Sequence, residues 1–416
     1  QAPTYIYRSV GPAGAAPLAT GGSSNYLSIS GSIAAFTSDL PENVGVGDAI
    51  QYDSDNTGVV NEICFIHKRI SSNTFLVKKA SGAAAEPTQS DDLDWSVFRA
   101  YTSLADAESG NENTSIDGLL RNFDSWVDGR DLTERVNNEI WNIACYADNP
   151  DTTTVTIDGW TTGPDNYLRI FTPVFSTETG KVQRHSGTWK ADAYSIEVDA
   201  VSDNTYMIDV REDFVRIEGL QIMLSNSGGY NSCHAIHLEG QSADSDVRIC
   251  GNIIKGAISL PLSEGIGIFG NSGDVTAKIH NNIIYDFING AQVGNGGIVV
   301  SAGGTFYIYN NTVCYCFEGV NGGAAGVVTV KNTVVQDCSD GFTGTFYGAS
   351  DFNVLDNDTD APNLTFTGGQ ATVSFVDEAG RDFHIDSSDT GALDKGTDLS
   401  ADAKSPLSDD IDRVER

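Results

Sequence analysis

Short segments in which hydrophobic and polar residues alternate recur through the second half of the chain. VRICGNIIKGA, AKIHNNIIYDF, FYIYNNTVCYC and VTVKNTVVQDC align without internal gaps, at offsets of 30, 29 and 22 residues. The alignment places Gly251, Asn281, Asn310 and Asn332 in one column, and FVRIEGLQIML adds Gly219 to it. Alternation with a period of two predicts strands, and Gly or Asn between the strands predicts turns.

The unequal repeat lengths narrow the choice of fold. They exclude helical repeats and the fixed-length leucine-rich pattern, whereas a right-handed parallel β-helix takes up length differences in the loops between its strands. Each repeat is then one coil, so we predict an all-β chain with the solenoid over residues 138–376. Asn suits a turn repeated in every coil, because it tolerates a left-handed backbone and its amides can hydrogen-bond from coil to coil.

The remaining segments differ in pattern. Residues 11–97 contain short strands broken by Gly, Pro and Asn, which predicts a small β module inserted after an N-terminal strand at residues 1–10. Helical spacing of apolar residues predicts an N-terminal helical cap over residues 98–137, which would protect the end of the first coil. Residues 377–416 are expected to form a C-terminal capping or anchor-like tail.

The charge balance limits the partners. The 416 residues include 24 Lys and Arg against 57 Asp and Glu, a formal net charge of -33. Such a field repels phosphate backbones and anionic lipid, so we expect no nucleic-acid partner and no membrane insertion. The chain opens at Gln1 and contains two Met, a pattern typical of an exported protein, and we predict an extracellular or cell-surface location after removal of a signal peptide.

Motifs near the C-terminus add a resemblance. FVD at 375–377, DFHI at 382–385, DKGT at 394–397 and DID at 410–412 occur in that order. With the coils, they make the chain resemble secreted bacterial right-handed parallel β-helix repeat proteins of pectate-lyase-like fold that carry a choice-of-anchor C-terminal segment, although Arg413 stands where that segment has Gly. The resemblance implies a fold and an exported protein. It does not select among lyases, epimerases, tailspikes and adhesins.

A possible calcium loop lies in the small module. QYDSDNTGVVNE places oxygen ligands in the order of an EF-hand loop, with Gly58 at the turn and Cys64 where the closing Glu would stand. A solvated acidic hairpin turn explains the same residues. The candidate calcium ligands are Asp53, Asp55, Thr57, the carbonyl of Val59, Asn61 and Glu62.

The polar positions of the aligned strands suggest a second site. Lys278, His280, Tyr309 and Lys331 could supply the base that a polysaccharide lyase needs to remove a proton beside a uronate carboxylate, and Arg248 could neutralise that carboxylate. The alternative is that these side chains are the ordinary polar exterior of a solenoid.

The seven cysteines lack a CxxC zinc spacing. Cys316 and Cys338 fall at one register in successive coils, at a separation that a disulfide permits. They could form a disulfide or remain as two stacked buried thiols.

Two functions are compatible with these patterns. The first is an extracellular structural or adhesive β-helix, which self-associates into surface or filament structures or binds an extracellular glycan. The alternative is a carbohydrate-active enzyme, a polysaccharide lyase. The small number of basic residues at the polar positions of the aligned strands and the high negative charge of the chain favour the first function, because a polyanionic substrate would be repelled.

Overall fold

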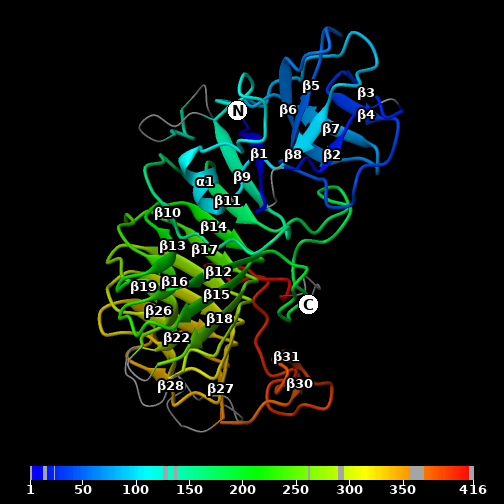
Figure 1. The fold of residues 1–416 in the computed structure, drawn as a ribbon. Coiled ribbons are helices and arrows are strands. Elements are labelled where there is room, and N and C mark those ends of the chain that lie inside the picture. The colour runs from blue at the N-terminus through cyan, green and yellow to red at the C-terminus, as the bar shows by residue number, and fades with distance from the viewer. Residues whose placement is uncertain are drawn as a thin grey trace. The chain divides into compact units, whose positions relative to one another are not determined.

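The computed structural model divides the chain into two compact units (Figure 1). Unit 1 comprises residues 1–151, 159–184 and 191–194, and unit 2 comprises residues 152–158, 185–190 and 195–416. The residues that the structure describes are 2–12, 16–22, 24–124, 130–134, 138–260, 263–288, 295–356 and 370–411. Almost all of their regular structure is strand, as predicted for an all-β chain.

Unit 2 is built from parallel strands in three sheets, and every third strand along the chain returns to the same sheet. Sheet 1 contains β14 (Val215–Glu218), β17 (Val247–Cys250), β20 (Thr276–His280), β23 (Thr305–Tyr309) and β26 (Val327–Lys331). Sheet 2 contains β10 (Val155–Ile157), β13 (Tyr206–Val210), β16 (His234–Leu238), β19 (Ile266–Gly270), β22 (Gly296–Val300), β25 (Glu318–Asn321) and β28 (Asp340–Thr343). Sheet 3 contains β12 (Ser195–Asp199), β15 (Gln221–Asn226), β18 (Ile253–Ile258), β21 (Ile283–Tyr285), β24 (Thr312–Cys314), β27 (Val334–Gln336) and β29 (Val354–Leu355). This strand order fits a parallel β-helix.

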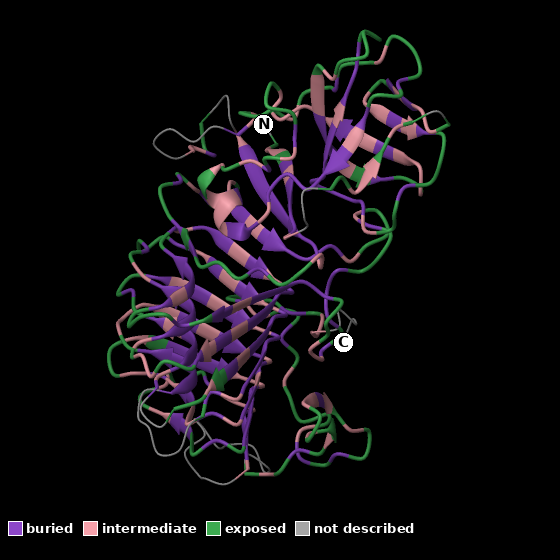
Figure 2. Ribbon diagram, viewed as in Figure 1, coloured by how far each residue is buried: buried purple, intermediate pink, exposed green. Residues whose placement is uncertain are grey.

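The aligned repeats pair in the register that the sequence predicts. Ile249 pairs with Ile279, which pairs with Ile308, which pairs with Val330, and all four side chains are fully buried. Such stacks run across the strands from coil to coil, and Figure 2 shows buried residues on strand after strand of unit 2. Burial of one aliphatic side chain contributes about 1.5–3 kcal/mol, so the repeated stack is the main source of stability for the coils.

The predicted turn column is confirmed by its backbone. The φ angles are 78° at Gly219, 61° at Gly251, 55° at Asn281, 54° at Asn310 and 52° at Asn332. Gly and Asn adopt this left-handed conformation at the lowest cost. The repeated phrase therefore encodes one turn, formed anew in each coil.

The amide ladder, however, lies one residue beyond that column. The Nδ2 group of Asn252 donates to Oδ1 of Asn282 at 3.0 Å, and Nδ2 of Asn282 donates to Oδ1 of Asn311 at 3.0 Å. All three side chains are buried. The prediction that the aligned Asn281 and Asn310 stack was wrong in position, because the residue after each left-handed turn is the one that points into the buried corner.

The C-terminal region folds back onto the coils. β30 (Phe375–Asp377) and β31 (Asp382–Ile385) form an antiparallel hairpin. Phe383 of this hairpin packs against Tyr285 and Cys314 on the outer side of sheet 3, and Arg381 pairs with Asp286 at 2.7 Å. The hairpin therefore covers part of one outer face.

Unit 1 contains an antiparallel sheet with its own apolar core. The strand order is β2 (Ala19–Thr20), β8 (Ser96–Phe98), β5 (Ala49–Tyr52), β6 (Glu62–Arg69), β7 (Thr74–Lys78), β4 (Ile33–Phe36) and β3 (Leu27–Ser30). Phe36 packs edge-on against Phe75 and Trp95 at its centre.

The N-terminal segment is a strand of unit 1. β1 (Thr4–Val10) pairs in parallel with β9 (Glu139–Cys145), which also pairs with β11 (Leu168–Phe171). Val10 forms a bridge with Tyr101, beyond the inserted sheet. Residues 4–10 are therefore used within the chain.

The structure gives no evidence of the predicted helical cap. In the described part of residues 98–137, the α-helix α1 spans only Leu104–Ser109, between an N-cap at Ser103 and the left-handed Gly110. Beyond it, the side chains of Asn113 and Asp117 accept hydrogen bonds from backbone N–H groups two residues later. Such local bonds compete with helix formation, and the spacing of apolar residues does not reveal them.

Candidate functional site

The residues predicted as catalytic do share two neighbouring columns on sheet 1. In the first column, Arg248 pairs in register with Lys278. In the second, His280 pairs with Tyr309, and Tyr309 pairs with Lys331. The structure therefore brings all five candidates together, as the alternation predicted.

The two cations of the first column are bound by one carboxylate. Asp246 lies 2.5 Å from Arg248 and 3.0 Å from Lys278. Burial opposes ionisation of Asp246, but the hydrogen bonds and charges of the two cations outweigh it and hold the pKa of this carboxyl below its usual value. The ammonium group of Lys278 is therefore already bound by a carboxylate of the protein and is not free to approach a substrate proton.

The second column is covered by the C-terminal segment. Lys331 pairs with Asp402 at 2.8 Å, and Tyr309 is 1% exposed beneath Leu399 and Leu407. Burial raises the pKa of the Tyr309 hydroxyl above its usual value. Neither group is available to take a proton from a substrate.

His280 is also shielded. Burial lowers the pKa of this imidazole to about 4, and its Nδ1 atom has no hydrogen-bond partner in the part of the chain that the structure describes. A cavity of about 330 Å³ separates the columns from residues 405–409. A neutral His280 could accept a proton, but the overlying segment limits access to it.

Two asparagines of the turn column hold this C-terminal segment. Asn332 donates from Nδ2 to the carbonyl of Thr397 at 2.8 Å and accepts from the N–H of Thr397 at 2.9 Å. Asn281 donates to the carbonyl of Asp409 at 3.1 Å. This contact could not be predicted from the sequence, because a tail without hydrophobic alternation gives no signal of where it docks.

Two carboxylates from another segment of unit 1 lie beside the predicted calcium loop, and the spacing of residues within the loop did not indicate them. Oxygen atoms of Asp53, Asp92 and Asp94 all lie within 4.8 Å of one another. Within the loop, Asp53 accepts hydrogen bonds from the N–H groups of Asp55 and Gly58, at 3.1 and 2.6 Å. Three close carboxylates suit a hard cation that prefers oxygen ligands.

The other predicted ligands of the loop are placed less favourably. Asn61 accepts from the N–H of Ser54 at 2.8 Å, and the hydroxyl of Thr57 donates to Asp55 at 2.9 Å. Val59 is exposed, and Glu62 lies in β6, 3.9 Å from Lys79. The fitting ligand set is therefore Asp53 with Asp92 and Asp94, and calcium binding there stays a prediction.

The two cysteines predicted as a disulfide candidate stand in equivalent positions. Cys314 pairs in register with Gln336, and Cys316 and Cys338 follow two residues later, each after a left-handed residue with φ of 55°. Both are buried thiols in the structure and lie in contact. The disulfide stays a prediction.

A further polar cluster lies on sheet 2. Asp209 accepts from Nδ1 of His237 at 2.8 Å and pairs with Arg211 at 2.9 Å, and Glu239 lies 3.9 Å from the same guanidinium. His237 stacks on Phe269. A metal could use Asp209, His237 and Glu239, but Arg211 already supplies the positive charge there.

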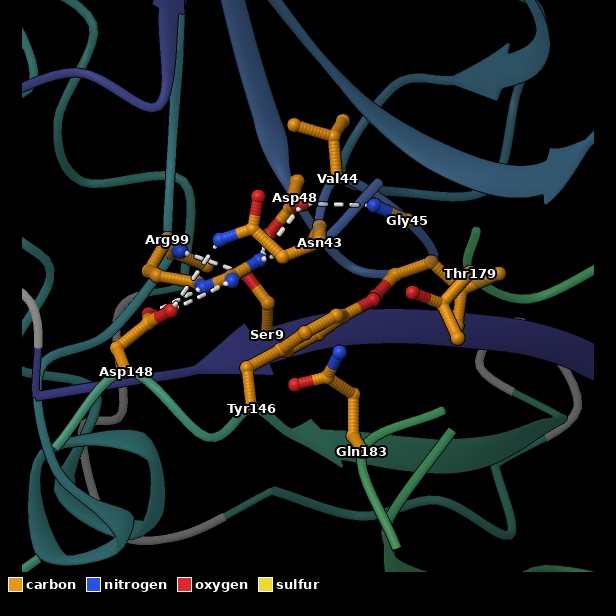
Figure 3. Close-up of polar contacts among 12 residues, drawn as sticks. Ser9, Asn43, Val44, Gly45, Asp48, Arg99, Tyr146, Asp148, Thr179 and Gln183 are labelled. Atoms are coloured by element: carbon orange, nitrogen blue, oxygen red, sulfur yellow. Dashed lines mark hydrogen bonds and ion pairs between the residues drawn. The ribbon is translucent and has the colours of Figure 1, made fainter. Parts of the chain in front are cut away.

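A cluster of charged side chains in unit 1 surrounds Arg99 (Figure 3). Its guanidinium contacts both oxygens of Asp48, at 2.8 and 2.9 Å, and Asp148 at 2.7 Å, and lies 3.7 Å from the ring centre of Tyr146. Burial opposes the charge, but the two carboxylates raise the pKa of Arg99 above its usual value. Because Arg99 and Asp48 are buried and Asp148 is only 9% exposed, this paired cluster joins the residue before β5 to the segment after β9 and offers little surface to a ligand.

Comparisons with protein-family models, curated proteins and solved structures find no match to this chain. Within the described residues, no helix has the length and hydrophobicity to cross a membrane.

Proposed function

We propose that the protein is an extracellular structural or adhesive protein built on a right-handed parallel β-helix. The observation that carries the proposal is the state of the outward columns on sheet 1. Lys278 and Arg248 share Asp246, Lys331 is bound by Asp402, and Tyr309 is buried. A lyase needs an accessible base beside a cation that can receive a carboxylate, and this arrangement favours a closed scaffold face.

We further propose that copies of the chain associate, and that calcium assists by binding near Asp53. A solenoid presents end surfaces through which copies can extend a rod. The net charge of -33 opposes association, so salt or calcium should promote it by screening repulsion over about 10 Å. The pairing of β1 with β9 disfavours a role for residues 4–10 as a strand donated to a neighbour.

A combined assay of activity and assembly tests the proposal. The full-length chain is incubated with polygalacturonate, alginate and hyaluronate, and unsaturated uronate products are followed by ultraviolet absorbance. Light scattering with and without calcium reports the mass of the particles in parallel. We expect no unsaturated product and a larger mass with calcium. Product formation that Lys278→Ala or Lys331→Ala abolishes would establish the alternative, a polysaccharide lyase.

A further inference from the structure

A cavity lies between the C-terminal segment and the turn column that follows the strands of sheet 1. Its volume is about 750 Å³, and its wall includes Asn310, Phe352, Val334, Leu393 and Ser400. This volume lies within the range of about 300–1,000 Å³ typical of small-molecule sites. The cavity is separate from the charged columns around Asp246.

Asn310 is the member of the turn column that the tail leaves open to this cavity. The neighbours on either side of it, Asn281 and Asn332, bind the backbone of the C-terminal segment. Asn310 lies between them and lines the cavity, and its buried Oδ1 atom has no hydrogen-bond partner within the described ranges. A buried acceptor without a partner costs about 1–3 kcal/mol, which a donor on a ligand would recover.

Phe352 forms a second unusual part of the wall. In the turn column, the N–H of one member donates to the carbonyl of the residue just before the next member. Asn310 donates in this way to Lys331, which precedes Asn332, and Asn332 donates to Asp351, which precedes Phe352. Phe352 is therefore the next member of the column. Its φ is 57°, a left-handed conformation that is unfavourable for a bulky side chain. The chain thus places an aromatic ring, at a cost in backbone strain, where earlier coils have Gly or Asn. Strain of this kind clusters at binding sites.

The chemistry of the wall selects the ligand. The wall combines apolar side chains, among them Val334, Leu393 and Phe352, with the acceptor-bearing side chains of Asn310 and Asp394. The wall carries one cation, Lys395, against the two carboxylates of Asp394 and Asp398. The acceptors suit a ligand with several hydroxyl donors, and the excess of carboxylates together with a net charge of -33 disfavours an anion. A neutral sugar ring offers both apolar C–H faces and hydroxyl donors.

We propose that this cavity binds a residue of a neutral glycan, with Oδ1 of Asn310 accepting from a sugar hydroxyl and the ring of Phe352 packing against the sugar face. The inference deepens the adhesive function proposed above, because it names the ligand class and the site. It does not depend on assembly or on the absence of lyase activity, so those results can fail without deciding this one.

Calorimetric titration of the full-length chain tests the site. The probes are cellohexaose, xylohexaose, mannohexaose and maltohexaose, with hexagalacturonate as the acidic counterpart. We expect one of the neutral oligosaccharides to bind at one site, at least about tenfold more tightly than hexagalacturonate, because the carboxylates of the acidic probe would meet Asp394, Asp398 and the net negative charge of the chain.

Four variants locate the binding. Asn310→Gly keeps the left-handed backbone, as Gly251 does in its coil, and should weaken binding about threefold to tenfold by removing one hydrogen bond. Phe352→Asn should weaken binding by a similar factor and leave the melting temperature equal or higher, a combination that a purely structural ring would not give. Ser400→Trp, at an exposed wall position, should abolish binding by filling the cavity. Asn204→Gly is the matched control, because Asn204 also has a left-handed backbone but does not line the cavity, and this variant should bind as the unmodified chain does.

Three results would overturn the proposal. The first is no heat of binding with any of the neutral oligosaccharides, and the second is tighter binding of hexagalacturonate. The third is binding that Asn310→Gly and Ser400→Trp leave unchanged while circular dichroism shows that both variants are folded, since the ligand would then lie elsewhere.

Discussion

The two units bury polar groups in opposite ways. In unit 2, the ladder through Asn252, Asn282 and Asn311 is neutral and repeats one hydrogen-bond pattern from coil to coil. In unit 1, Arg99 stands between Asp48 and Asp148 and concentrates three charges at one place. Loss of one ladder member leaves neutral groups unpaired, whereas loss of Arg99 leaves two carboxylates without their cation. In a repeated ladder, the loss of one side chain therefore costs only the few neutral hydrogen bonds of that coil. In a single non-local cluster, the loss of one side chain leaves several buried charges unpaired at once.

The largest effect should follow from Arg99→Met. This change leaves the fully buried Asp48 without a cation, and breaking such a pair costs about 3–5 kcal/mol. Chemical denaturation followed by circular dichroism should show a large loss of stability in unit 1. Arg211→Met is the matched control, because its side chain is 43% exposed and such a pair contributes under about 1 kcal/mol. Equal small effects for both variants would contradict the comparison.

A smaller loss is expected from Asn282→Ala. This side chain accepts from the backbone and side-chain N–H groups of Asn252 and donates to Ile249 and Asn311. Leaving neutral partners unsatisfied costs about 1–3 kcal/mol. Asn281→Gly, one residue earlier, retains the turn and should cost much less. Thermal melts of both variants measure the difference, and a larger effect at residue 281 would show that the ladder is misassigned.

The pH dependence of unit 2 should contain a contribution from His280. Its pKa is lowered from 6.5 to about 4 by burial, with Glu218, Arg248 and Lys278 as the charged neighbours. As the pH falls, the imidazole is protonated in the unfolded state before it is protonated in the folded state. The contribution of neutral His280 to the free energy of unfolding is therefore complete above about pH 6.5 and is lost as the pH falls toward about 4. Between about pH 7.5 and about pH 5.5 the loss of unfolding free energy from this group should be about 1.4 kcal/mol.

The variant His280→Gln isolates this contribution. Unfolding free energies of the two proteins are measured across the same pH range, and their difference is plotted against pH. We expect the variant to lose less stability on acidification than the unmodified chain. Parallel curves would mean that His280 titrates normally in the folded protein and is not buried.

The smallest effect should come from calcium. If Asp53, Asp92 and Asp94 bind the ion, free calcium at about five times the dissociation constant stabilises unit 1 by about 1 kcal/mol, because only the folded state binds. Asp53→Asn should remove the increase in melting temperature. A melt that excess chelator leaves unchanged, with no calcium by elemental analysis, would reject the site.

The sequence predicted the coils because their information is local and repeated. Alternation assigned Ile249, Ile279 and Ile308 to the core, and the aligned Gly and Asn positions gave the left-handed turns. The amide ladder was displaced by one residue, since alignment identifies a column but not the direction in which its side chains point. The expected helical cap is not evidenced beyond α1 in the described residues, and apolar spacing does not reveal the local bonds of Asn113 and Asp117.

The site could be predicted only in part. Strand register brought Lys278, His280, Tyr309 and Lys331 together as expected, but nothing in the pattern indicated that Asp246 and Asp402 bind the lysines. Such partners come from loops and from the tail, whose contacts are non-local. The same limit explains why Asp92 and Asp94 were missed beside the Asp53 loop.

Hydrogen exchange of the C-terminal segment tests the central claim most directly, namely that this segment closes the outward columns of sheet 1. The amide of Thr397 donates to Asn332, and the side chain of Asp402 binds Lys331. Mass spectrometry of the full-length chain should find slow exchange at Thr397, and Asn332→Gly, which retains the turn, should accelerate it. Fast exchange at Thr397 in the unmodified chain, equal to that in the variant, would contradict the account and leave the columns open to a substrate.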